Sequence, residues 1–421
     1  MKFEELGLAE TLLRAVRGEG YSTPTQIQAA AIPVILEGRD VLGCAQTGTG
    51  KTAAFALPTL QRLGQVASQN SGRRKIRTLV LAPTRELVIQ IGESFHAYGR
   101  HTGLRRTVVY GGVGQNPQVR SLQAGVDVLV ATPGRLLDLM QQGFIDLSHV
   151  EILILDEGDR MLDMGFIHDL RRIVAKVPTR RQTLLFSATI PPAIRQLADQ
   201  WLTKPVDIHV NPVARTADKI QQSVFFVDQA NKIRMLTHWL QTTDWTRTLV
   251  FTRTKHRADK VAKLLNKAGI EADAFHADKS QSSRQRILAR FKSPDPVVLI
   301  ATDIAARGLD IDMVSHVINF DLPVDAENYI HRIGRTGRAG ADGVALSFCD
   351  VSEREVLHAI QRLTKQTLVV EAAPKGLPPV SVLSAKPATA KAKRASAPRP
   401  FSHSGKPKWP GKKRRAAYAG K

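Results

Sequence analysis

The sequence predicts two α/β domains, each built on a doubly wound parallel sheet and joined by a short linker, followed by a disordered basic tail. Its 421 residues exceed one ordinary domain, because single cores stop growing at roughly 250 to 300 residues. Short apolar runs rich in β-branched residues alternate with longer helical patterns, which is typical of βαβ units. The alternation pauses near residue 210 and ends near residue 372, and these two points define the predicted boundaries.

The first domain is predicted over residues 1–208. Nearly continuous apolar runs there predict strands that are buried on both faces of a sheet. In a doubly wound sheet, functional groups gather at the carboxyl ends of the strands, where Thr84, Asp156 and Ser187 stand. The runs cover residues 77–83, 127–133, 151–157 and 182–189.

A polar stretch over residues 209–218, which contains Pro212, is predicted to be the linker. The same alternation then resumes, so residues 219–372 are predicted to form a second α/β domain similar to the first. Its expected strands lie in the runs SVFFVD, RTLVFTR, PVVLIATD and HVINFD.

The last segment, residues 373–421, is rich in Pro, Ala, Ser and Lys, a composition that cannot bury a core. Residues 374–421 contain thirteen Lys and Arg and no Asp or Glu. We predict that this disordered basic tail is a nonspecific nucleic-acid arm, in which Phe401, Trp409 and Tyr418 stack on bases. A solvated linker is the alternative.

The whole chain carries 60 Lys and Arg against 38 Asp and Glu, a formal net charge of +22. Such an excess favours a polyanionic partner, and nucleic acid is the commonest one. An anionic membrane is the competing partner, but the sequence has no apolar run of about 18 residues. Simple solubility is the third interpretation of the basic surface.

Only Cys44 and Cys349 occur, and the first residues, MKFEELGLAE, lack a charged and then apolar leader. Neither a disulfide framework nor export is therefore expected. A reducing, cytoplasmic location is predicted.

A glycine-rich turn between a predicted strand and a helix start lies in residues 40–52, DVLGCAQTGTGKT. Its end matches a P-loop, although Ala45 replaces the first glycine of the general pattern. Backbone amides of residues 48–51 would hold phosphates, Lys51 would reach the β and γ phosphates, and Thr52 would bind magnesium. The turn therefore predicts a nucleotide site.

Two carboxylates at the end of the ILILDE strand support this prediction. Asp156 stands where a magnesium ligand belongs, and Glu157 would orient or deprotonate the attacking water. The predicted second domain contains HRIGRTGR, with Arg332, Arg335 and Arg338. These arginines would stabilise the transition state, or they would contact phosphates of a nucleic acid.

Together these residues resemble the DEAD-box RNA helicases of superfamily 2, and residues 3–364 carry the motif series of that family in order. The resemblance implies RecA-like domains, ATP with Mg²⁺ as cofactors, and RNA-stimulated ATP hydrolysis. It also implies that AQTGTGKT is the family's usual P-loop, which accounts for Ala45. The arginine fingers would be Arg335 and Arg338, beside Lys51, Asp156 and Glu157 as catalytic residues.

The same resemblance implies nucleotide contacts around a Q motif in GYSTPTQIQ, residues 20–28. Tyr21 would stack on adenine, Gln28 would bond its edge, Phe3 matches an isolated upstream aromatic, and Asp310 would contact the ribose. The full set of expected nucleotide contacts is Phe3, Tyr21, Thr23, Gln28, Ala45, Gln46, Thr47, Gly48, Thr49, Gly50, Lys51, Thr52 and Asp310.

Further motifs imply an RNA surface and residues that couple it to the nucleotide. The expected RNA contacts are Pro83, Thr84, Arg85, Gly111, Gly112, Thr132, Pro133, Gly134, Arg135, Arg253 and Thr302. The expected coupling residues are Asp159, Ser187, Ala188, Thr189 and His331.

One position departs from the family pattern, because the signature Asp-Glu-Ala-Asp is here Asp156-Glu157-Gly158-Asp159. The carboxylates survive, so ATP hydrolysis is expected to persist. Looser coupling to RNA and neutral drift are the two interpretations of Gly158. The residues around the motifs, such as RMLDMGF in residues 160–166, look most like those of the bacterial RhlE-like branch. That branch implies roles in ribosome assembly, RNA turnover or cold adaptation.

The expected mechanism is closure of the two domains by ATP and RNA, which melts a short RNA duplex locally with little sequence specificity. A nucleotide-dependent RNA clamp or assembly scaffold that seldom separates strands is the alternative, and a DNA helicase is a second one. Ribosomal or RNA-decay assemblies are expected partners, and a monomer is the default.

Overall fold

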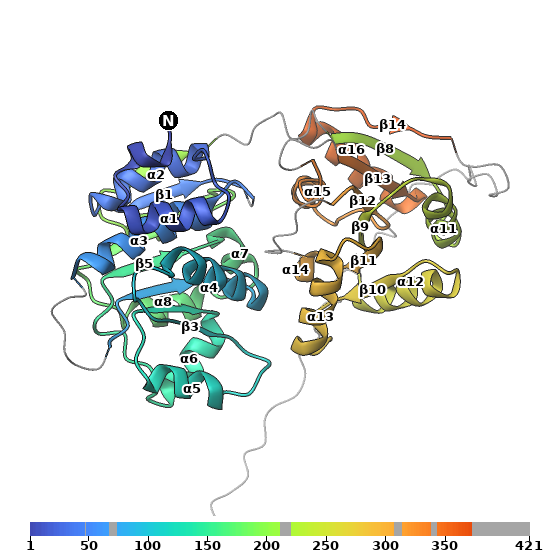
Figure 1. The fold of residues 1–421 in the computed structure, drawn as a ribbon. Helices are drawn as coiled ribbons and strands as arrows, with labels where there is room; N and C mark the ends of the chain where they lie inside the picture. Colours follow the sequence, from blue (N-terminus) through green and yellow to red (C-terminus); the bar gives the residue numbers. More distant parts are fainter. Residues whose placement is uncertain (47, 67–73, 211–219, 307–313, 338–342, 373–421) are drawn as a thin grey trace, which may run out of the picture. The chain divides into compact units, whose positions relative to one another are not determined.

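The computed structural model describes residues 1–46, 48–66, 74–210, 220–306, 314–337 and 343–372. The predicted tail, most of the predicted linker, and the predicted site residues Thr47, Asp310 and Arg338 lie outside them. Within the described residues the expected architecture is confirmed, because the chain forms two seven-stranded parallel sheets with helices around each (Figure 1).

The first sheet has the strand order β3-β4-β2-β5-β6-β1-β7, and every neighbouring pair is parallel. All four expected runs contain strands, and β5, with the sequence ILIL, is buried along its whole length. The strands are β1 (Val41–Cys44), β2 (Thr78–Leu81), β3 (Arg106–Val109), β4 (Val128–Ala131), β5 (Ile152–Leu155), β6 (Gln182–Ser187) and β7 (Val206–His209).

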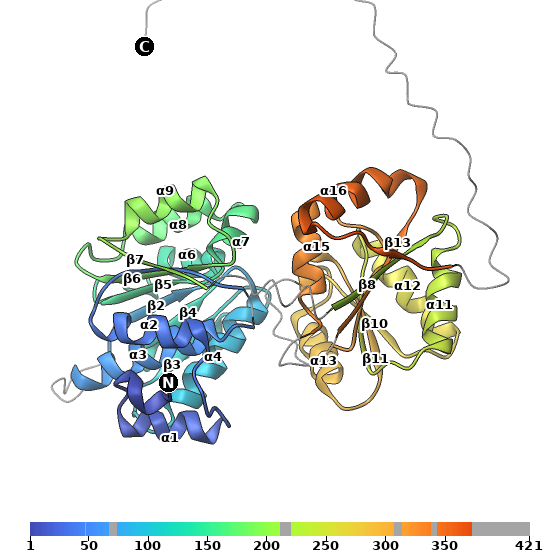
Figure 2. The same ribbon diagram turned by 90° about the horizontal axis from the view of Figure 1, so that it is seen from above.

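Helices cover both faces of this sheet, as Figure 2 shows for α2 and α3 on one side and α8 and α9 on the other. Successive strand residues point to opposite faces of the sheet and so pack into two different cores. Val41 packs in the core beneath α2 and α3, whereas Leu42 packs in the core beneath α8 and α9. The helices are η1 (Phe3–Leu6), α1 (Glu10–Gly18), α2 (Gln26–Leu36), α3 (Lys51–Val66), α4 (Arg85–Gly99), α5 (Asn116–Gln123), α6 (Pro133–Gln141), α7 (Gly158–Asp163), α8 (Ile167–Val174) and α9 (Pro192–Trp201).

The second sheet repeats the pattern with the strand order β10-β11-β9-β12-β13-β8-β14. Its strands are β8 (Ile220–Phe226), β9 (Arg247–Phe251), β10 (Ala272–Phe275), β11 (Val297–Ala301), β12 (His316–Asn319), β13 (Gly343–Cys349) and β14 (Val369–Val370). Its helices are α11 (Lys232–Thr242), α12 (Lys255–Lys267), α13 (Gln281–Lys292), α14 (Asp303–Ala306), α15 (Ala326–Ile333), η3 (Val351–Glu353) and α16 (Arg354–Thr364).

The register of the first sheet brings the candidate motifs to one edge. Cys44, the last residue of β1, pairs with Ser187, and Leu155 pairs with Leu81 and Leu185. Because these strands are parallel, the segments that follow them emerge at the same carboxyl edge. In the part of the chain that the structure describes, no helix combines the length and apolar character needed to cross a bilayer.

Candidate active site

The P-loop turn between β1 and α3 depends on glycine at two positions. Gly48 and Gly50 have φ angles of +84° and +90°, a region that glycine adopts without a steric penalty. A Cβ on Gly50 would also lie 2.4 Å from the side-chain nitrogen of Gln28. The turn therefore packs its backbone directly against the segment that begins α2.

Gln28 ties that segment to the P-loop. Its Oε1 accepts a hydrogen bond from the Thr25 backbone N–H at 2.9 Å, and its Nε2 donates to the Gly50 carbonyl at 3.1 Å. The side chain is buried, with 4 % exposure. Both ends of the amide thus have partners within the protein, and the contact of Gln28 with an adenine edge stays a prediction.

A cavity of about 450 Å³ opens beside these groups at the carboxyl edge of the first sheet. Nine of the residues predicted from the sequence to bind nucleotide or act in catalysis line it, namely Tyr21, Thr23, Gln28, Gly48, Gly50, Lys51, Thr52, Asp156 and Glu157. The tertiary structure therefore brings the Q-motif segment, the P-loop and the ILILDE strand to one site.

Other predicted nucleotide contacts lie away from the cavity lining. Phe3 and Ala45 are 2 % and 1 % exposed and pack in the core beneath α2 and α3. Thr49 donates a hydrogen bond from Oγ1 to the Gln46 carbonyl at 2.7 Å, which stabilises the turn itself. For these four residues the structure shows a packing or turn-forming position, and direct nucleotide contact stays a prediction.

Lys51 and Asp156 provide the charges of the cavity. Lys51 is 6 % exposed, and its ammonium has no hydrogen-bond partner among the described residues and lies 3.9 Å from Asp156 Oδ1. Burial raises the pKa of Asp156 to about 6, with Glu157 and Asp159 adding to the rise and Lys51 opposing it. The described residues therefore leave the Lys51 ammonium without a hydrogen bond and make ionisation of Asp156 unfavourable. The charges of this cavity are only partly compensated.

Glu157 has an uncommon backbone conformation. Its φ and ψ angles are 54° and 53°, in the left-handed region, and the residue is 3 % exposed. A non-glycine residue in this region carries a modest strain that is often found at active sites. Arg160 Nε lies 3.5 Å from Glu157 Oε2, so a guanidinium on the first turns of α7 stands beside this carboxylate.

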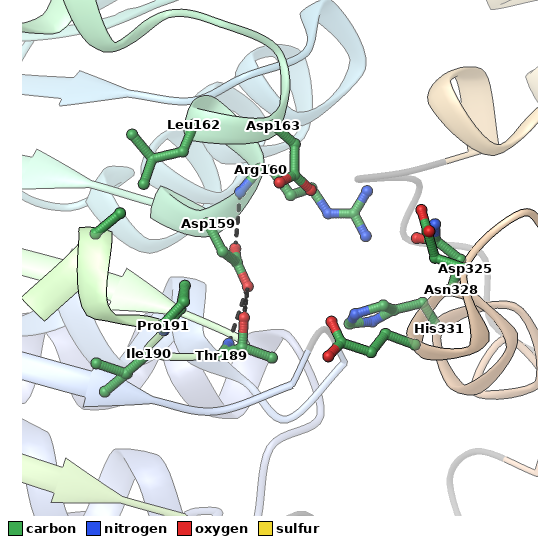
Figure 3. Close-up of a pocket in the computed structure, with 12 residues that line it drawn as sticks. Asp159, Arg160, Leu162, Asp163, Thr189, Ile190, Pro191, Asp325, Asn328 and His331 are labelled. Carbon is green, nitrogen blue, oxygen red and sulfur yellow. Dashed lines mark hydrogen bonds between the residues drawn. The ribbon is translucent and has the colours of Figure 1, made fainter. Parts of the chain in front are cut away.

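The predicted coupling residues of the first domain form a hydrogen-bonded network, and Figure 3 shows its bonds between Asp159 and Thr189. Asp159 Oδ2 accepts bonds from the Thr189 N–H and hydroxyl, both at 2.9 Å, and the Asp159 N–H donates to Ser187 Oγ at 3.0 Å. Burial alone would raise the pKa of Asp159, but the Thr189 bonds and the charge of Lys51 hold that pKa below its ordinary value. The DEGD segment and the SAT segment are thus joined directly, with Ala188 between the two hydrogen-bonding residues.

The predicted RNA contacts of the first domain come from three neighbouring loops, after β2, β3 and β4. Gly112 has a φ of +79°, and a Cβ there would lie 2.1 Å from an Arg85 guanidinium nitrogen. Arg135 donates to the Val113 carbonyl at 3.3 Å. These contacts join the loops, so Pro83, Thr84, Gly111, Thr132, Pro133 and Gly134 lie on segments that meet.

In the second domain, Arg253 follows β9 and keeps 45 % side-chain exposure. Its N–H donates to Asp321 Oδ2 and its guanidinium to Glu353 Oε1, both at 2.9 Å. Buried carboxylates therefore fix the loop that carries Arg253. Thr302 directly precedes α14, and its carbonyl accepts from the Ala306 N–H at 3.0 Å.

The arginines of HRIGRTGR differ in their roles. Arg332 donates to both carboxylate oxygens of Asp303, at 2.6 and 2.8 Å, and to Asn319, and it is 2 % exposed. A guanidinium that is saturated in this way is structural. Arg335 lies two residues beyond α15, and His331 lies within that helix. The finger role of Arg335 stays a prediction.

Sequence motifs missed one wall of the cavity. Gln90, Ser94 and Tyr98 of α4 line it, at intervals of four residues that place them on one face of the helix. No sequence motif marks these three residues, because polar side chains also occupy other positions of α4.

The described residues contain no group of three or more His, Cys, Asp or Glu side chains that could hold a metal ion by themselves. Fold and cavity together define the chain as a P-loop protein with two RecA-like domains. Its defining features are a P-loop lysine, a carboxylate after another strand of the same sheet, and a second parallel sheet.

Comparisons with known proteins agree with this class. The DEAD/DEAH box helicase model matches residues 25–197, and the helicase conserved C-terminal domain model matches residues 231–340. The DEAD-box ATP-dependent RNA helicase CshA of Geobacillus kaustophilus is 44 % identical over 366 residues, which cover 87 % of this chain and 77 % of that protein. The ATP-dependent RNA helicase CshA of Limosilactobacillus reuteri is 43 % identical over 365 residues, which cover 87 % of this chain and 72 % of that protein.

Among solved structures, S. cerevisiae Dbp5 bound to RNA and ADP BeF3 is 33 % identical, with a TM-score of 0.78 over 88 % of this chain and 95 % of that one. The chain therefore belongs to the DEAD-box ATP-dependent RNA helicases. The resemblance inferred from the motifs is confirmed at the level of the family, and the RhlE-like branch stays a prediction.

Proposed function

We propose that this helicase couples RNA-stimulated ATP hydrolysis to local separation of short RNA duplexes or to remodelling of RNA–protein complexes. The observation that carries the proposal is the buried Lys51 ammonium, which faces a cavity beside Asp156 and Glu157 and has no hydrogen-bond partner in the part of the chain that the structure describes. A buried ammonium without a hydrogen bond is costly, and a phosphate oxygen would supply its missing partner.

The residues around the cavity have the chemistry that a nucleoside triphosphate requires. Backbone amides at the start of α3 and the Lys51 ammonium would bind the phosphates. The hydroxyl of Thr52 and the carboxylate of Asp156 are hard oxygen ligands, which suit Mg²⁺ when phosphates and water complete its shell. When bound, Mg²⁺ would neutralise charge that develops on the phosphates.

Glu157 would then orient the attacking water and accept its proton, because its carboxylate lines the same cavity. Arg335 and Arg338 would stabilise the transition state from the second domain. An arginine finger contributes about 10³ to 10⁵ in rate, so its arrival would switch hydrolysis on.

RNA is the expected polymer because the loops of Arg85, Gly112 and Arg135 present backbone and guanidinium groups that suit phosphates. Support also comes from the similar Dbp5 structure, which is described as bound to RNA and ADP BeF3. Contacts of this kind do not read bases, so we expect little sequence specificity.

The test is steady-state ATP hydrolysis by the full chain with and without single-stranded RNA, beside Glu157→Gln. We expect RNA to raise the rate of the wild-type chain and the substitution to abolish it while nucleotide binding persists. Equal stimulation by DNA of the same length would instead indicate a DNA helicase. Absence of hydrolysis with intact ATP binding would contradict the proposed enzyme activity.

A nucleotide-dependent RNA clamp is the second candidate, and Gly158 is the observation that favours it. Gly158 lies directly before Asp159, whose bonds to Ser187 and Thr189 join two coupling motifs. Displacement of one strand from a short RNA duplex discriminates the candidates. Strand release that depends on hydrolysis supports the helicase, whereas RNA retention without release supports the clamp.

We also propose that the basic segment after residue 373 adds nonspecific affinity for RNA, because it carries thirteen cationic side chains and no acidic one. Deletion of residues 374–421 should weaken RNA binding and flatten its dependence on salt, since fewer counterions are released. Unchanged affinity and slope across several salt concentrations would exclude this role. The ribosomal or RNA-decay partners, the cytoplasmic location and the monomeric state are further predictions from the sequence.

A further inference from the structure

Helix α4 contributes a wall to the nucleotide cavity that lies outside the motifs. Its residues Gln90, Ser94 and Tyr98 line the cavity together with Tyr21 of the Q-motif segment. Tyr21 and Tyr98 are 77 residues apart in sequence, yet their hydroxyl oxygens lie 3.3 Å apart. Their ring centroids are 6.3 Å apart, and the ring planes are inclined by 58°.

The two tyrosines differ sharply in burial. Tyr98 is 4 % exposed and packs in the core of the first domain, whereas Tyr21 is 41 % exposed. Tyr98 therefore has a fixed position, and Tyr21 gains a fixed hydrogen-bonding partner from it. An exposed aromatic ring that must stack on a base loses rotational freedom when the base binds, and a partner that holds the ring beforehand reduces this loss.

We propose that Tyr98 is a positioning residue, whose hydroxyl holds the Tyr21 ring in the orientation that stacks on the adenine base. This inference rests on the proposed function, in which the cavity binds ATP and Tyr21 contacts its base. It adds to that function a determinant of base affinity on α4, a helix whose first residue, Arg85, belongs to the predicted RNA surface.

A second contact ties the Q-motif segment to the same end of α4. The Arg100 guanidinium forms an ion pair with the Glu19 carboxylate and also donates from Nε to the Ala97 carbonyl at 2.8 Å. A Cβ on Gly18 would lie 3.4 Å from the Arg100 guanidinium, so the chain passes close by. The segment that carries Tyr21 is therefore held to α4 at two neighbouring points.

The chemistry of the Tyr98 hydroxyl suits this role. Burial and the hydrogen bond with Tyr21 raise the pKa of Tyr98 above its ordinary value, so the hydroxyl keeps its proton at neutral pH. Ser94 is a further hydrogen-bonding neighbour of Tyr98 and also lines the cavity. The protonated hydroxyl is thus available to bond Tyr21 at neutral pH.

Tyr98→Phe tests the proposal, because it keeps the packed ring and removes the hydroxyl. Binding would be measured with two probes, ADP and inorganic tripolyphosphate, and only the first carries a base. We expect the Kd for ADP to rise about threefold to tenfold, the range expected for loss of one hydrogen bond, with the Kd for tripolyphosphate unchanged. In turnover, KM for ATP should rise with kcat at saturating ATP unchanged.

The hydroxyl pair also predicts non-additivity. Tyr21→Phe should reproduce the rise in the ADP Kd, and the double variant should be no weaker than either single variant, because both changes remove the same bond. Tyr329→Phe is the matched control, since the Tyr329 hydroxyl bonds Gln222 at 3.0 Å in the second domain, in a buried site of its own. It should leave both Kd values unchanged.

The outcomes distinguish failure of the Tyr98 positioning role from failure of the proposed ATP site. Wild-type chain that binds neither ADP nor tripolyphosphate would refute the proposed ATP site. Wild-type binding of ADP with an unchanged Kd in Tyr98→Phe would overturn the positioning role alone. A parallel loss of ADP and tripolyphosphate affinity would also overturn it, because it would show general damage to the cavity.

Discussion

Two buried lysines, one in each domain, have opposite surroundings. Lys51 Nζ in the first domain has no hydrogen-bond partner within the described ranges, and Asp156 Oδ1 lies 3.9 Å from it. Lys232 Nζ in the second domain is fully buried and donates to Glu353 Oε2 at 2.5 Å and to the Phe348 carbonyl at 3.2 Å. Carboxylate oxygens of Asp321 and Asp350 also lie 3.8 Å from Lys232 Nζ.

The difference distinguishes a binding cation from a structural one. Burial of an ammonium is costly, and the second domain offsets that cost with hydrogen bonds and several carboxylates. The first domain leaves its ammonium without hydrogen bonds, so a ligand with negative charge gains most at that point. The same residue type therefore serves folding in one domain and binding in the other.

The largest expected effect comes from Lys232→Met, which keeps the volume of the side chain and removes its charge. We expect the free energy of unfolding to fall by about 3 to 5 kcal/mol, because Glu353 and its neighbours lose the buried cation. Urea unfolding of the full chain measures it. Lys260→Ala, at an exposed position on α12, should change stability by less than about 0.5 kcal/mol. An unchanged midpoint in Lys232→Met would remove the structural role.

The same substitution at Lys51 should impair ATP hydrolysis and leave the stability of the fold nearly unchanged. For Lys51→Met we expect ATP hydrolysis to fall at least about 10²-fold to 10³-fold, the usual loss for one charged group that stabilises a transition state. The free energy of unfolding without nucleotide should change by less than about 1 kcal/mol, since no hydrogen bond of Nζ is lost. A large loss of stability in this variant would show that Lys51 is structural as well.

Asp156→Asn probes the other charge of the cavity. Burial raises the pKa of Asp156 from its ordinary value near 3.8 to about 6, so the folded chain binds this proton more tightly than the unfolded chain. The tighter binding of this proton stabilises the folded chain below pH 4, and that stabilisation is lost as pH rises through 6. At pH 8 the buried, ionised Asp156 lowers the free energy of unfolding by an amount on the order of 3 kcal/mol.

Asp156→Asn should therefore stabilise the nucleotide-free chain at pH 8 and give little gain near pH 4, while hydrolysis is lost. Urea unfolding at the two pH values, without Mg²⁺, measures this. Asp163→Asn is a control on the same segment. An equal shift of stability at both pH values would contradict the ionisation as its cause.

Gly158→Ala should have the smallest effect. Alanine is favoured over glycine in a helix by about 1 kcal/mol, but its Cβ would lie 2.9 Å from Leu185 Cδ1 and 3.4 Å from Ile194 Cδ1. These side-chain ends can shift, so the net change in stability should stay below about 1 kcal/mol. The ratio of RNA-stimulated to basal ATP hydrolysis decides between neutral drift, which leaves the ratio unchanged, and looser coupling, which predicts a rise in Gly158→Ala.

Much of the fold could be predicted from local pattern. The apolar runs that contain β2, β4, β5 and β6 are buried along their length, and a chain segment of this kind has few alternatives to a central parallel strand. Edge strands such as β7 and β14 were not predicted, because their exposed residues break the apolar run. The positions of Asp156 and Ser187 at strand ends followed from the same patterns.

The candidate site was predicted in part. Sequence spacing identified Lys51 and Asp156, because a P-loop and the residues after a buried strand have local signatures, whereas Asp159 followed from the family resemblance. It placed Phe3 among the nucleotide contacts, where the structure shows a core position. It did not find Tyr98, because a single tyrosine in a helix has no local signature of a distant hydroxyl partner.

The sequence by itself determined the two parallel sheets, the order of the motifs and the excess of positive charge, since each of these is encoded by residues that are close along the chain. Only the tertiary structure decided which side chains meet. Gln28 reaches Gly50 across 22 residues, Tyr21 reaches Tyr98 across 77, and Lys232 reaches Glu353 across 121. Such contacts depend on how sheets and helices pack, and packing is a property of the whole domain rather than of any short segment.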